Sequence, residues 1–253
     1  MSDGVLAGRT ALVTGSARRI GREIARELAA RGARIAVHAR ERRDDAERVA
    51  EEINSAGGKA AAFIGDVSDP DVAPRLVDDV AEWAGGLDIL VNNAAIRRAA
   101  RLADLDYAEW RAVTSVILDG TFLMSRAAAP LLATGGAGRI VNIGGVTSHI
   151  GADSRAHVVA AKAGVVGLTK ALAVELGPQG ITVNCLAPGL IEDEGDDPEH
   201  TAFRRRHTPP EQIPIRRIGR PSDVGRAVAT LCGDEFDYLT GQTIHLNGGI
   251  FLW

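Results

Sequence analysis

Short apolar runs alternate with helical patterns along almost the whole chain. Runs rich in Val, Ile, Leu and Ala indicate strands at residues 10–15, 34–40, 60–68, 87–95, 138–145, 181–189 and 242–249. The segments between them predict helices at residues 22–33, 44–58, 71–85, 106–133, 154–177 and 222–232. Strands that are apolar on both faces and alternate with helices indicate a parallel sheet covered on both sides. We therefore predict an α/β fold: a single doubly wound domain over residues 1–253, with a mostly parallel sheet of about seven strands and helices on both faces.

Composition and charge exclude several classes of protein. Hydrophobic residues make up 45% and charged residues 25% of the chain, and the formal net charge of −4 gives no overall attraction to nucleic acid or an anionic membrane. The first residues lack the pattern of a signal peptide, and no uncharged apolar run reaches the roughly 18 residues that a membrane span needs. Cys185 and Cys232 lie far apart in apolar surroundings, so we expect buried free thiols and no metal site. We expect a cytoplasmic protein with no nucleic-acid or membrane partner.

One long segment interrupts the alternation. Residues 190–220 contain an acidic block, then a basic block, and four prolines. An irregular insertion of this length is usually a functional lid or a disordered loop. We predict a lid-like substrate loop within the domain.

A glycine-containing segment follows the first predicted strand. Residues 14–21 read TGSARRIG and open the first predicted helix. Backbone N–H groups at a helix N-terminus, approached through glycine, bind anions such as phosphates. A glycine loop alone is weak evidence, but a strand before it and a helix after it are the context in which such a loop binds a dinucleotide. The spacing is not G-x-G-x-x-G and resembles T-G-x-x-x-G-x-G, with Arg19 in place of the middle glycine.

The end of the second predicted strand, VHAR, indicates which dinucleotide is bound. A carboxylate about 20 residues after the loop selects the ribose 2′-hydroxyl of NAD. Here the strand ends in Ala39 and Arg40, and the nearby loop contains Arg18 and Arg19. Arginine favours a 2′-phosphate through charge-assisted bidentate hydrogen bonds. We therefore predict NADP(H) in preference to NAD(H). The other interpretation is that Arg40 is one more solvated charge in the run ARERR.

Further motifs complete a family pattern. They are GDVSD (65–69), VNNAA (91–95), GRIVNIGG (138–145), AAKAGVVGLTKALAVELGPQGITVNCLAPG (160–189), GRPSDVG (219–225) and YLTGQTIHLNGG (238–249), together with TGSARRIG. Over nearly its whole length the chain resembles the short-chain dehydrogenase/reductases, a family of oxidoreductases with a Rossmann domain. The paired arginines of the glycine loop are similar to the pteridine-reductase branch, which uses NADPH.

The resemblance implies a set of cofactor contacts and no metal site. In and beside the glycine loop they are Gly15, Ser16, Arg18, Arg19, Ile20, Gly21 and Arg40. Asp66 and Val67 would meet the adenine, and Asn93, Ala94 and Ala95 would line the dinucleotide. Pro188, Gly189 and Ile191 would pack on the nicotinamide, and Lys162 would hold the hydroxyls of its ribose.

The chain departs from the family pattern at the catalytic groups. The family uses Asn, Ser, Tyr and Lys: Tyr transfers the proton, Lys lowers its pKa, Ser holds the substrate oxygen and Asn helps to keep a water in the proton relay. The position four residues before Lys162, one helical turn away, is Val158 rather than Tyr. Gly145 stands at the Ser position and Ile117 at the Asn position. No shift of register restores the Tyr, because the chain's only tyrosines are Tyr107 and Tyr238.

Other polar residues near Val158 are candidate proton donors. Histidine titrates near neutral pH, but His157 points about 100° away from Val158 around the helix. We therefore expect His157 on the helix surface or at a subunit interface. Thr147, Ser148 and His149 follow the fifth predicted strand, where they could bind a substrate oxygen or form a plain polar loop.

Two functional hypotheses follow. The first is an NADP(H)-dependent oxidoreductase that transfers hydride to a small carbonyl, imine or conjugated substrate by a non-standard proton path. The second is a catalytically silent dinucleotide-binding protein that acts as a sensor or partner subunit. We favour the first, because the glycine loop, Lys162 and the segment APG all fit cofactor use. The resemblance also implies a homotetramer or homodimer, and the substrate is unknown.

Overall fold

One parallel sheet forms the centre of the protein in the computed structural model, which describes residues 4–192 and 209–252. Within those residues the seven strands are β1 Thr10–Val13, β2 Arg34–Ala39, β3 Lys59–Ile64, β4 Ile89–Asn92, β5 Arg139–Ile143, β6 Thr182–Pro188 and β7 Thr243–Leu246. Their order is β3-β2-β1-β4-β5-β6-β7, and every neighbouring pair is parallel. The strand order reverses between β1 and β4, as in other doubly wound sheets. The predicted fold is confirmed, with a wholly parallel sheet.

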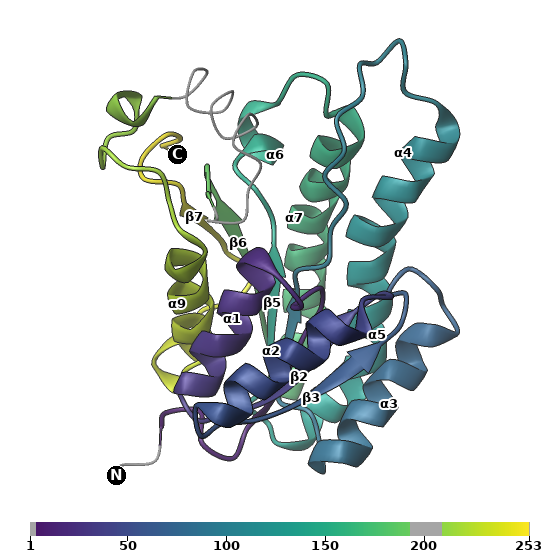
Figure 1. Cartoon of the computed structure of the whole chain (residues 1–253), viewed down its shortest axis with the longest axis vertical. Coiled ribbons are helices and arrows are strands. Elements are labelled where there is room, and N and C mark those ends of the chain that lie inside the picture. Colours follow the sequence, from purple (N-terminus) through teal and green to yellow (C-terminus); the bar gives the residue numbers. More distant parts are fainter. Residues whose placement is uncertain (1–3, 193–208, 253) are drawn as a thin grey trace.

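Helices cover both faces of this sheet (Figure 1). One face carries α1 Arg19–Ala30, α2 Arg43–Ser55 and α9 Pro221–Leu231. The other carries α3 Val72–Ala84, α5 Gly120–Thr134 and α7 Ala156–Leu176, with α4 Tyr107–Thr114 packed on α7. Each face is joined to its helices by a buried cluster of mostly Val, Ile, Leu and Ala side chains. Because both faces of each strand are buried, the strands appear in the sequence as continuous apolar runs.

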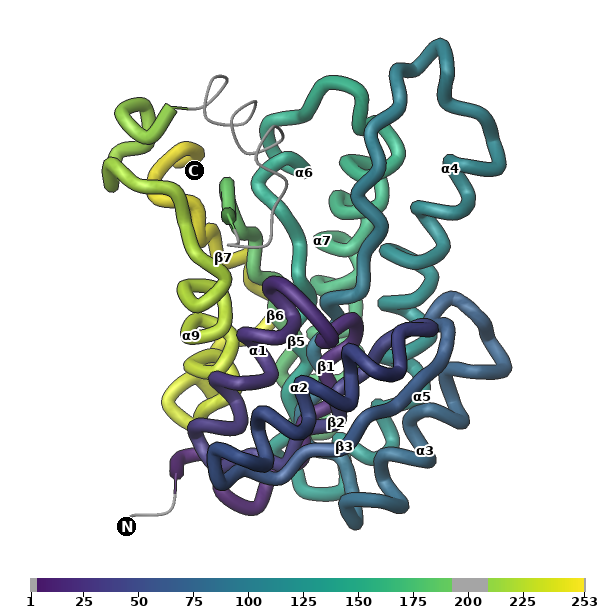
Figure 2. Tube along the Cα trace, viewed as in Figure 1, coloured from purple at the N-terminus to yellow at the C-terminus, as the bar shows by residue number. Residues whose placement is uncertain are grey.

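Two helices that are far apart in the sequence, α1 and α9, pack against each other. The late helix α9 lies beside the early helix α1 (Figure 2). A Cβ atom at Gly225 of α9 would lie 2.7 Å from the carbonyl oxygen of Glu23 in α1. Glycine at this position therefore lets the two helix backbones approach each other closely.

The helix predicted at residues 106–133 is continuous but irregular. α4 runs into a π-helical segment, Ser115–Asp119, which leads directly into α5. The segment contains Ile117, whose carbonyl oxygen accepts a hydrogen bond from Thr121 Oγ1 at 2.6 Å. π-Helical turns inside α-helices are frequent at functional sites. A further one-turn helix, α6 Thr147–Ile150, follows β5 and is absent from the sequence prediction.

The lid-like loop predicted at residues 190–220 is described only at its two ends. Ile191 pairs with Gly219 through an isolated parallel bridge, which ties the beginning of the segment to its end. A short 3₁₀ helix lies at Pro210–Gln212. Residues 193–208, with most of the two charged blocks, lie outside the described residues.

Two helical stretches of the described chain are long and apolar enough to cross a membrane, judged by length and composition alone. They are Tyr107–Thr134 and Ala156–Gln179, each with a mean hydropathy of 1.4. Both stretches contribute side chains to the core clusters of this domain, and a buried core helix passes the same test. Only 39% of each apolar window is buried, so both stretches keep apolar surface outside the core.

Both cysteines are buried and free, as expected. Burial raises the pKa of the Cys185 thiol to about 11 and that of Cys232 to about 12. Thiols with such raised pKa values are poor nucleophiles at neutral pH.

Candidate cofactor and active site

The glycine loop lies where the strand order reverses. It leaves the carboxyl end of β1, beside the carboxyl end of β4. Asn93 donates from Nδ2 to the carbonyl oxygens of Thr14 at 2.8 Å and Gly15 at 3.1 Å. Thr14 Oγ1 accepts hydrogen bonds from the backbone N–H groups of Asn93 at 2.9 Å and Ala94 at 3.0 Å. These bonds hold the loop at the sheet edge where doubly wound folds bind ligands. The Asn93 side chain thus contacts the backbone of the glycine loop and affects the site through it.

Two glycines let the loop fold tightly onto the first turn of α1. Gly15 has a φ of +64°, a left-handed conformation that favours glycine. A Cβ atom at Gly21 would lie 2.3 Å from the Gly15 carbonyl oxygen and 2.6 Å from Asn93 Nδ2. Ser16 and Ile20 are buried, so their side chains support the loop from inside. The N-terminus of α1 therefore forms a cradle that fits a phosphate group.

His38 in β2 joins the glycine loop to the loop after β3, a role that was not predicted from the sequence. Its Nδ1 accepts a hydrogen bond from the Gly15 N–H at 3.0 Å, and its Nε2 lies 2.9 Å from the Gly65 carbonyl oxygen. His38 is 2% exposed, and burial lowers the pKa of its imidazole to about 4. The available signal was a polar residue in an otherwise apolar strand, because a buried polar group needs partners.

We expect the free energy of unfolding to fall as the pH is lowered from 6.5 to about 4. The pKa of His38 is lowered by folding, so below pH 6.5 the unfolded chain binds a proton that the folded protein does not. Neutral His38 therefore contributes roughly 3 kcal/mol to the free energy of unfolding above pH 6.5, and this contribution is lost as the pH falls to about 4. The hydrogen bond to the Gly65 carbonyl oxygen and, less strongly, the charge of Asp66 favour the protonated imidazole, but burial outweighs both.

Chemical unfolding of the wild type and of His38→Asn, at about pH 7 and about pH 4.5, measures this change. Asn does not titrate, so the variant should lose most of this part of the pH dependence. Equal losses of stability in the two proteins would show that other groups cause the effect.

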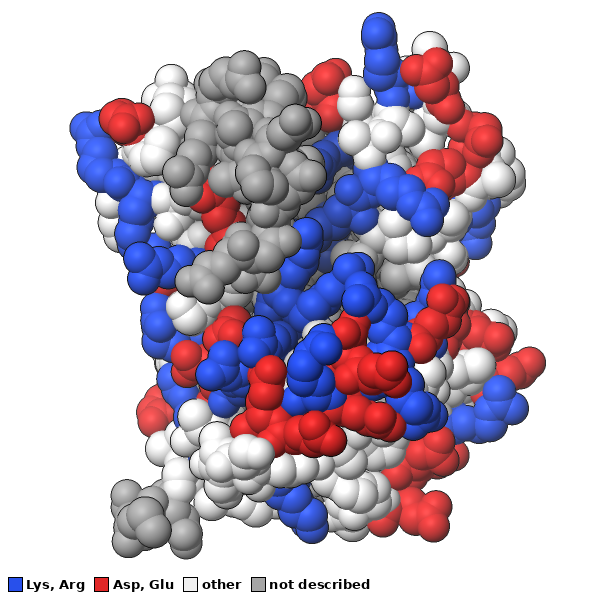
Figure 3. All heavy atoms as spheres, in the orientation of Figure 1, with Lys and Arg blue, Asp and Glu red and all other residues white. Residues whose placement is uncertain are grey.

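Exposed arginines lie in the glycine loop and at the end of β2. Arg18, Arg19 and Arg40 are exposed, and Figure 3 shows Lys and Arg side chains gathered across this face, with Asp and Glu side chains among them over α2. The Arg40 guanidinium lies 3.0 Å from the carboxylate of Glu41 and 4.0 Å from that of Asp66. Arg40, after β2, and Asp66, after β3, thus lie close together, and both were predicted from the sequence as contacts of the cofactor.

The residues predicted around the rest of the dinucleotide lie along the same sheet edge. Ala94 and Ala95 follow Asn93 after β4, and Val67 is 4% exposed after β3. Pro188 ends β6, and the Gly189 N–H donates to the Leu246 carbonyl oxygen at 2.9 Å. A Cβ atom at Gly189 would lie 2.8 Å from Asn247, so the two chain segments pass closely there. The predicted contacts therefore extend from the glycine loop to the end of β6.

A buried hydrogen-bond network beneath this edge joins the strands to the helices. Asn92 Nδ2 donates to Asn142 Oδ1 at 2.9 Å and to Ser125 Oγ at 3.1 Å. Asn142 Nδ2 donates to Thr169 Oγ1 at 2.9 Å. The sequence gives no sign of this network, because Asn92 and Asn142 become neighbours only in the register of β4 and β5. The network holds α7 against β5 and so positions Lys162.

Lys162 lies in the second turn of α7 and is 7% exposed. Its Nζ donates a hydrogen bond to the carbonyl oxygen of Ile143 at the end of β5. Burial, with a smaller contribution from the positive charge of Arg97, lowers the pKa of Lys162 to about 8. An ammonium with a pKa near neutrality can bind hydroxyl groups and can also donate a proton.

The three positions that depart from the family pattern have different surroundings. Ile117 and Val158 are 1% and 5% exposed and pack in one apolar cluster with Val113, Ala161 and Val165. At Gly145, on the loop after β5, an added Cβ would have Thr147 Oγ1 as its nearest neighbour, at 3.8 Å. Hydrocarbon therefore fills the positions that match Tyr and Asn, whereas open space adjoins the position that matches Ser.

His157 is buried, so the expectation of a surface or interface histidine was wrong. It is 0% exposed within the single chain, and its ring nitrogens have no hydrogen-bond partner in the described structure. Beside it on α7, Val158 packs in one cluster with Val113 of α4, and just before the helix the Ala100 N–H donates to the Ser154 carbonyl oxygen at 2.8 Å. These long-range contacts were not visible in the local sequence pattern.

The polar residues after β5 form α6 rather than an open loop. Ser148 Oγ donates to the Gly145 carbonyl oxygen at 2.7 Å. The His149 ring packs edge-on against His245 of β7, with ring centroids 4.5 Å apart. Ser148 and His149 therefore have contacts within the protein that a substrate would have to share or replace.

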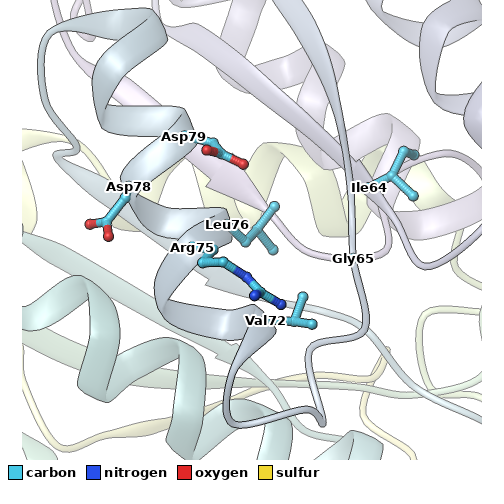
Figure 4. Close-up of a pocket in the computed structure, with 7 residues that line it drawn as sticks. All are labelled: Ile64, Gly65, Val72, Arg75, Leu76, Asp78 and Asp79. Carbon is cyan, nitrogen blue, oxygen red and sulfur yellow. The ribbon is translucent and has the colours of Figure 1, made fainter.

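A cavity of about 470 Å³ lies beside α3 (Figure 4). It is lined by Ile64, Gly65, Val72, Arg75, Leu76, Asp78 and Asp79. The cavity is lined neither by Lys162 nor by Ile117, Gly145 or Val158. We therefore locate the candidate active site by the sheet edge and not by this cavity.

Comparison with known proteins identifies the family. A family model described as Enoyl-(Acyl carrier protein) reductase matches residues 15–250. The chain is 39% identical over 244 residues to the 3-oxoacyl-[acyl-carrier-protein] reductase FabG of Staphylococcus aureus, covering 96% of this chain and 98% of that protein. A solved structure from Sinorhizobium meliloti, provisionally described as a short-chain alcohol dehydrogenase, matches with a TM-score of 0.91 and 37% identity over 97% of each chain. The chain belongs to the short-chain dehydrogenase/reductase family.

Other relatives of this short-chain dehydrogenase/reductase agree in length and fold. FabG of Aquifex aeolicus is 36% identical over 247 residues, covering 97% of this chain and 98% of that protein. A dehydrogenase/reductase from Sinorhizobium meliloti matches with a TM-score of 0.91 and 35% identity, over 99% and 98% of the two chains. The protein is thus an oxidoreductase of the short-chain dehydrogenase/reductase type.

Proposed function

We propose that this oxidoreductase uses NADP(H) to reduce a small carbonyl, imine or conjugated substrate. The observation that carries the proposal is the cradle at the N-terminus of α1, where the backbone at Gly21 leaves no room for a side chain and Arg18 and Arg19 are exposed. Such a cradle fits a pyrophosphate, and arginines beside it fit a 2′-phosphate. Arg40, near Asp66, adds a third positive charge at the adenosine end.

Bound NADP(H) would supply the hydride. The chain's own residues would bind and orient the reactants: Lys162 would hold the ribose hydroxyls, and Pro188, Gly189 and Ile191 would pack beside the nicotinamide. With Val158, Gly145 and Ile117 at the positions of Tyr, Ser and Asn, the proton takes a non-standard path. Lys162, with its pKa lowered to about 8, is one donor for this path, and an already protonated substrate is another.

The proposed departures from the usual catalytic set favour some substrates over others. A positioned acid contributes about 10²–10⁴ in rate, and a hydrogen bond to a developing oxyanion contributes about 10²–10³. A simple ketone needs both contributions, whereas a protonated imine or a conjugated ring needs less acid assistance. The names of the relatives make a 3-oxoacyl thioester the first carbonyl compound to test.

A second candidate function is silent dinucleotide binding, in a sensor or a partner subunit. The observation that favours it is the apolar cluster around Ile117 and Val158, which offers no proton donor in its described members. A protein of this kind would bind NADPH and leave every substrate unchanged.

One experiment separates the two candidates. Purified protein is titrated with NADPH, followed by nicotinamide fluorescence, and then mixed with a 3-oxoacyl thioester, a cyclic imine and an enone. NADPH oxidation that depends on one of these probes supports the oxidoreductase. Tight NADPH binding with no turnover of any probe supports silent binding.

Arg40→Ala is expected to raise the Kd for NADPH by roughly tenfold and to leave the Kd for NADH almost unchanged. The guanidinium would lose its charge-assisted bonds to the 2′-phosphate, which NADH lacks. Arg43→Ala is the matched control, because Arg43 is also exposed and lies 3.5 Å from Glu47 on α2. Equal changes for both nucleotides, or the same effect from Arg43→Ala, would contradict the role of Arg40.

We also propose that the protein is a cytoplasmic homotetramer or homodimer. The exposed apolar surface of α5 and α7, which includes Phe122 and Val174, suits association with a second copy. Sedimentation equilibrium tests this proposal, because a monomer has a mass of 26.6 kDa. A mass of one chain at micromolar concentration would contradict it.

A further inference from the structure

Two loops that adjoin the candidate cofactor site, after β1 and after β3, meet at the side chain of His38, in the strand β2 that lies between β1 and β3. The loops after β1, β2 and β3 each contribute residues to the predicted site, at Gly15, Arg40 and Asp66. We propose that His38 is a positioning residue: it fixes the glycine loop relative to the adenine side of the site, so that NADP(H) affinity depends on a side chain that does not touch the cofactor. The inference rests on the proposed NADP(H) binding.

The two ring nitrogens of His38 have different partners on different loops. Nδ1 accepts from the Gly15 N–H at 3.0 Å, so Nδ1 carries no proton. Nε2 then carries the proton and donates to the Gly65 carbonyl oxygen at 2.9 Å. This assignment of the tautomer follows from the hydrogen bonds. One neutral imidazole therefore spans the distance between the glycine loop and the residue before Asp66.

The backbone of His38 holds the same loop through Ser16. The His38 N–H donates to Ser16 Oγ at 2.9 Å, and the Ser16 N–H donates to the His38 carbonyl oxygen at 2.9 Å. Ser16 Oγ donates in turn to the Val13 carbonyl oxygen at 2.7 Å. Side chain and backbone of His38 thus act together on two consecutive loop residues.

These contacts determine which loop groups face the cofactor. The N–H groups of Gly15 and Ser16 bond to His38, so they point into the protein and not toward a phosphate. The loop leaves Gly15 with a φ of +64° and turns into α1, which presents its own first N–H groups to the cradle. Without the imidazole, the Gly15 N–H and the Gly65 carbonyl oxygen would lose their buried partner, and the loop would take up other conformations.

Three substitutions separate the two ring contacts. His38→Phe keeps the ring and removes both hydrogen bonds. His38→Asn keeps an acceptor oxygen near the place of Nδ1, within reach of Gly15, but is too short for Gly65. His38→Gln places an amide nitrogen near the place of Nε2, within reach of Gly65. The NADPH affinities of the three variants show which of the two hydrogen bonds, to Gly15 or to Gly65, the binding of NADPH requires.

The test measures Kd values for NADPH and for adenosine 2′,5′-bisphosphate, a fragment that lacks the pyrophosphate and the nicotinamide. We expect His38→Phe to raise the Kd for NADPH by roughly tenfold or more, and the Kd for the fragment by a smaller factor. We expect His38→Asn to restore most of the NADPH affinity and His38→Gln to restore less of it. A general loss of stability would instead raise the Kd values for both ligands by the same factor. Thermal unfolding confirms that each variant is folded at the assay temperature.

Amide hydrogen exchange at Gly15 in the cofactor-free protein gives a readout that does not depend on binding. His38→Phe should accelerate exchange at Gly15 at least tenfold and leave Gly225 in α9 unchanged. A folded His38→Phe variant that binds NADPH as the wild type does, or that keeps Gly15 protected, would overturn the inference. Wild-type protein that binds neither NADPH nor NADH would overturn the proposed function, which is a different outcome.

Discussion

Reduction of a 3-oxoacyl thioester by NADPH is expected to be about 10²–10⁴-fold faster in the double variant Val158→Tyr/Gly145→Ser than in the unchanged protein. The new Tyr hydroxyl would donate the proton, and the new Ser hydroxyl would hold the substrate oxygen. The ammonium of Lys162, one helical turn from position 158, would favour the ionised form of the Tyr and so lower its pKa. Values of kcat/KM from the absorbance of NADPH measure the gain.

The structure has more room for one of these substitutions than for the other. At Gly145 the nearest atom to an added Cβ is Thr147 Oγ1 at 3.8 Å, so a Ser fits without strain. Val158 is 5% exposed and packs in the cluster with Ile117, so the Tyr ring has to extend out of that cluster toward the sheet edge. Overpacking of a core lowers the free energy of unfolding by about 1–3 kcal/mol, so we expect Val158→Tyr to lower the Tm.

The control for this variant is Val158→Phe/Gly145→Ser, which has the same ring without the hydroxyl. An equal gain in the control would show that the ring acts by its bulk and not as an acid. A folded Tyr and Ser variant that binds NADPH and gains no activity would show that the remaining frame, including Lys162, does not support the usual chemistry.

Gly21→Ala is expected to raise the Kd for NADPH by about 100-fold, because a displaced loop would lose backbone hydrogen bonds to the pyrophosphate, and hydrogen bonds to charged groups contribute roughly 1.5–3 kcal/mol each. The new Cβ would lie 2.3 Å from the Gly15 carbonyl oxygen and 2.8 Å from Ser16 Cα. Both are backbone atoms, so the whole loop has to move away from α1. In an unconstrained helix the same substitution would stabilise by about 1 kcal/mol, so a loss here cannot come from helix propensity.

Gly177→Ala is the matched control for Gly21→Ala. Gly177 has a φ of −54° at the end of α7, and an added Cβ would meet no atom within 4 Å. Titration by nicotinamide fluorescence and thermal unfolding of both variants measure binding and stability separately. Wild-type affinity for NADPH in a folded Gly21→Ala variant would contradict the assignment of the cradle.

The type and order of the main elements could be predicted from the sequence, but their ends could not. The run at residues 87–95 contains β4, yet the strand covers only Ile89–Asn92 because pairing with its neighbours stops there. The following residue, Asn93, leaves the sheet to hold the glycine loop. Likewise, the periodicity of the long helix at 106–133 gave no sign of the π-helical segment that contains Ile117.

The sequence by itself determined the parallel α/β class, the glycine loop, the arginines beside it, and the side chains present at positions 117, 145, 158 and 162. These features depend on local composition and spacing, which are legible along a single chain. Only the tertiary structure decided that His38 joins two loops, that Asn93 braces the glycine loop, that His157 is buried, and that Ile117 packs on Val158. The physical reason is distance along the chain: His38 and Gly15 are 23 positions apart and Asn93 and Thr14 are 79 apart, so folding alone brings them within hydrogen-bonding reach.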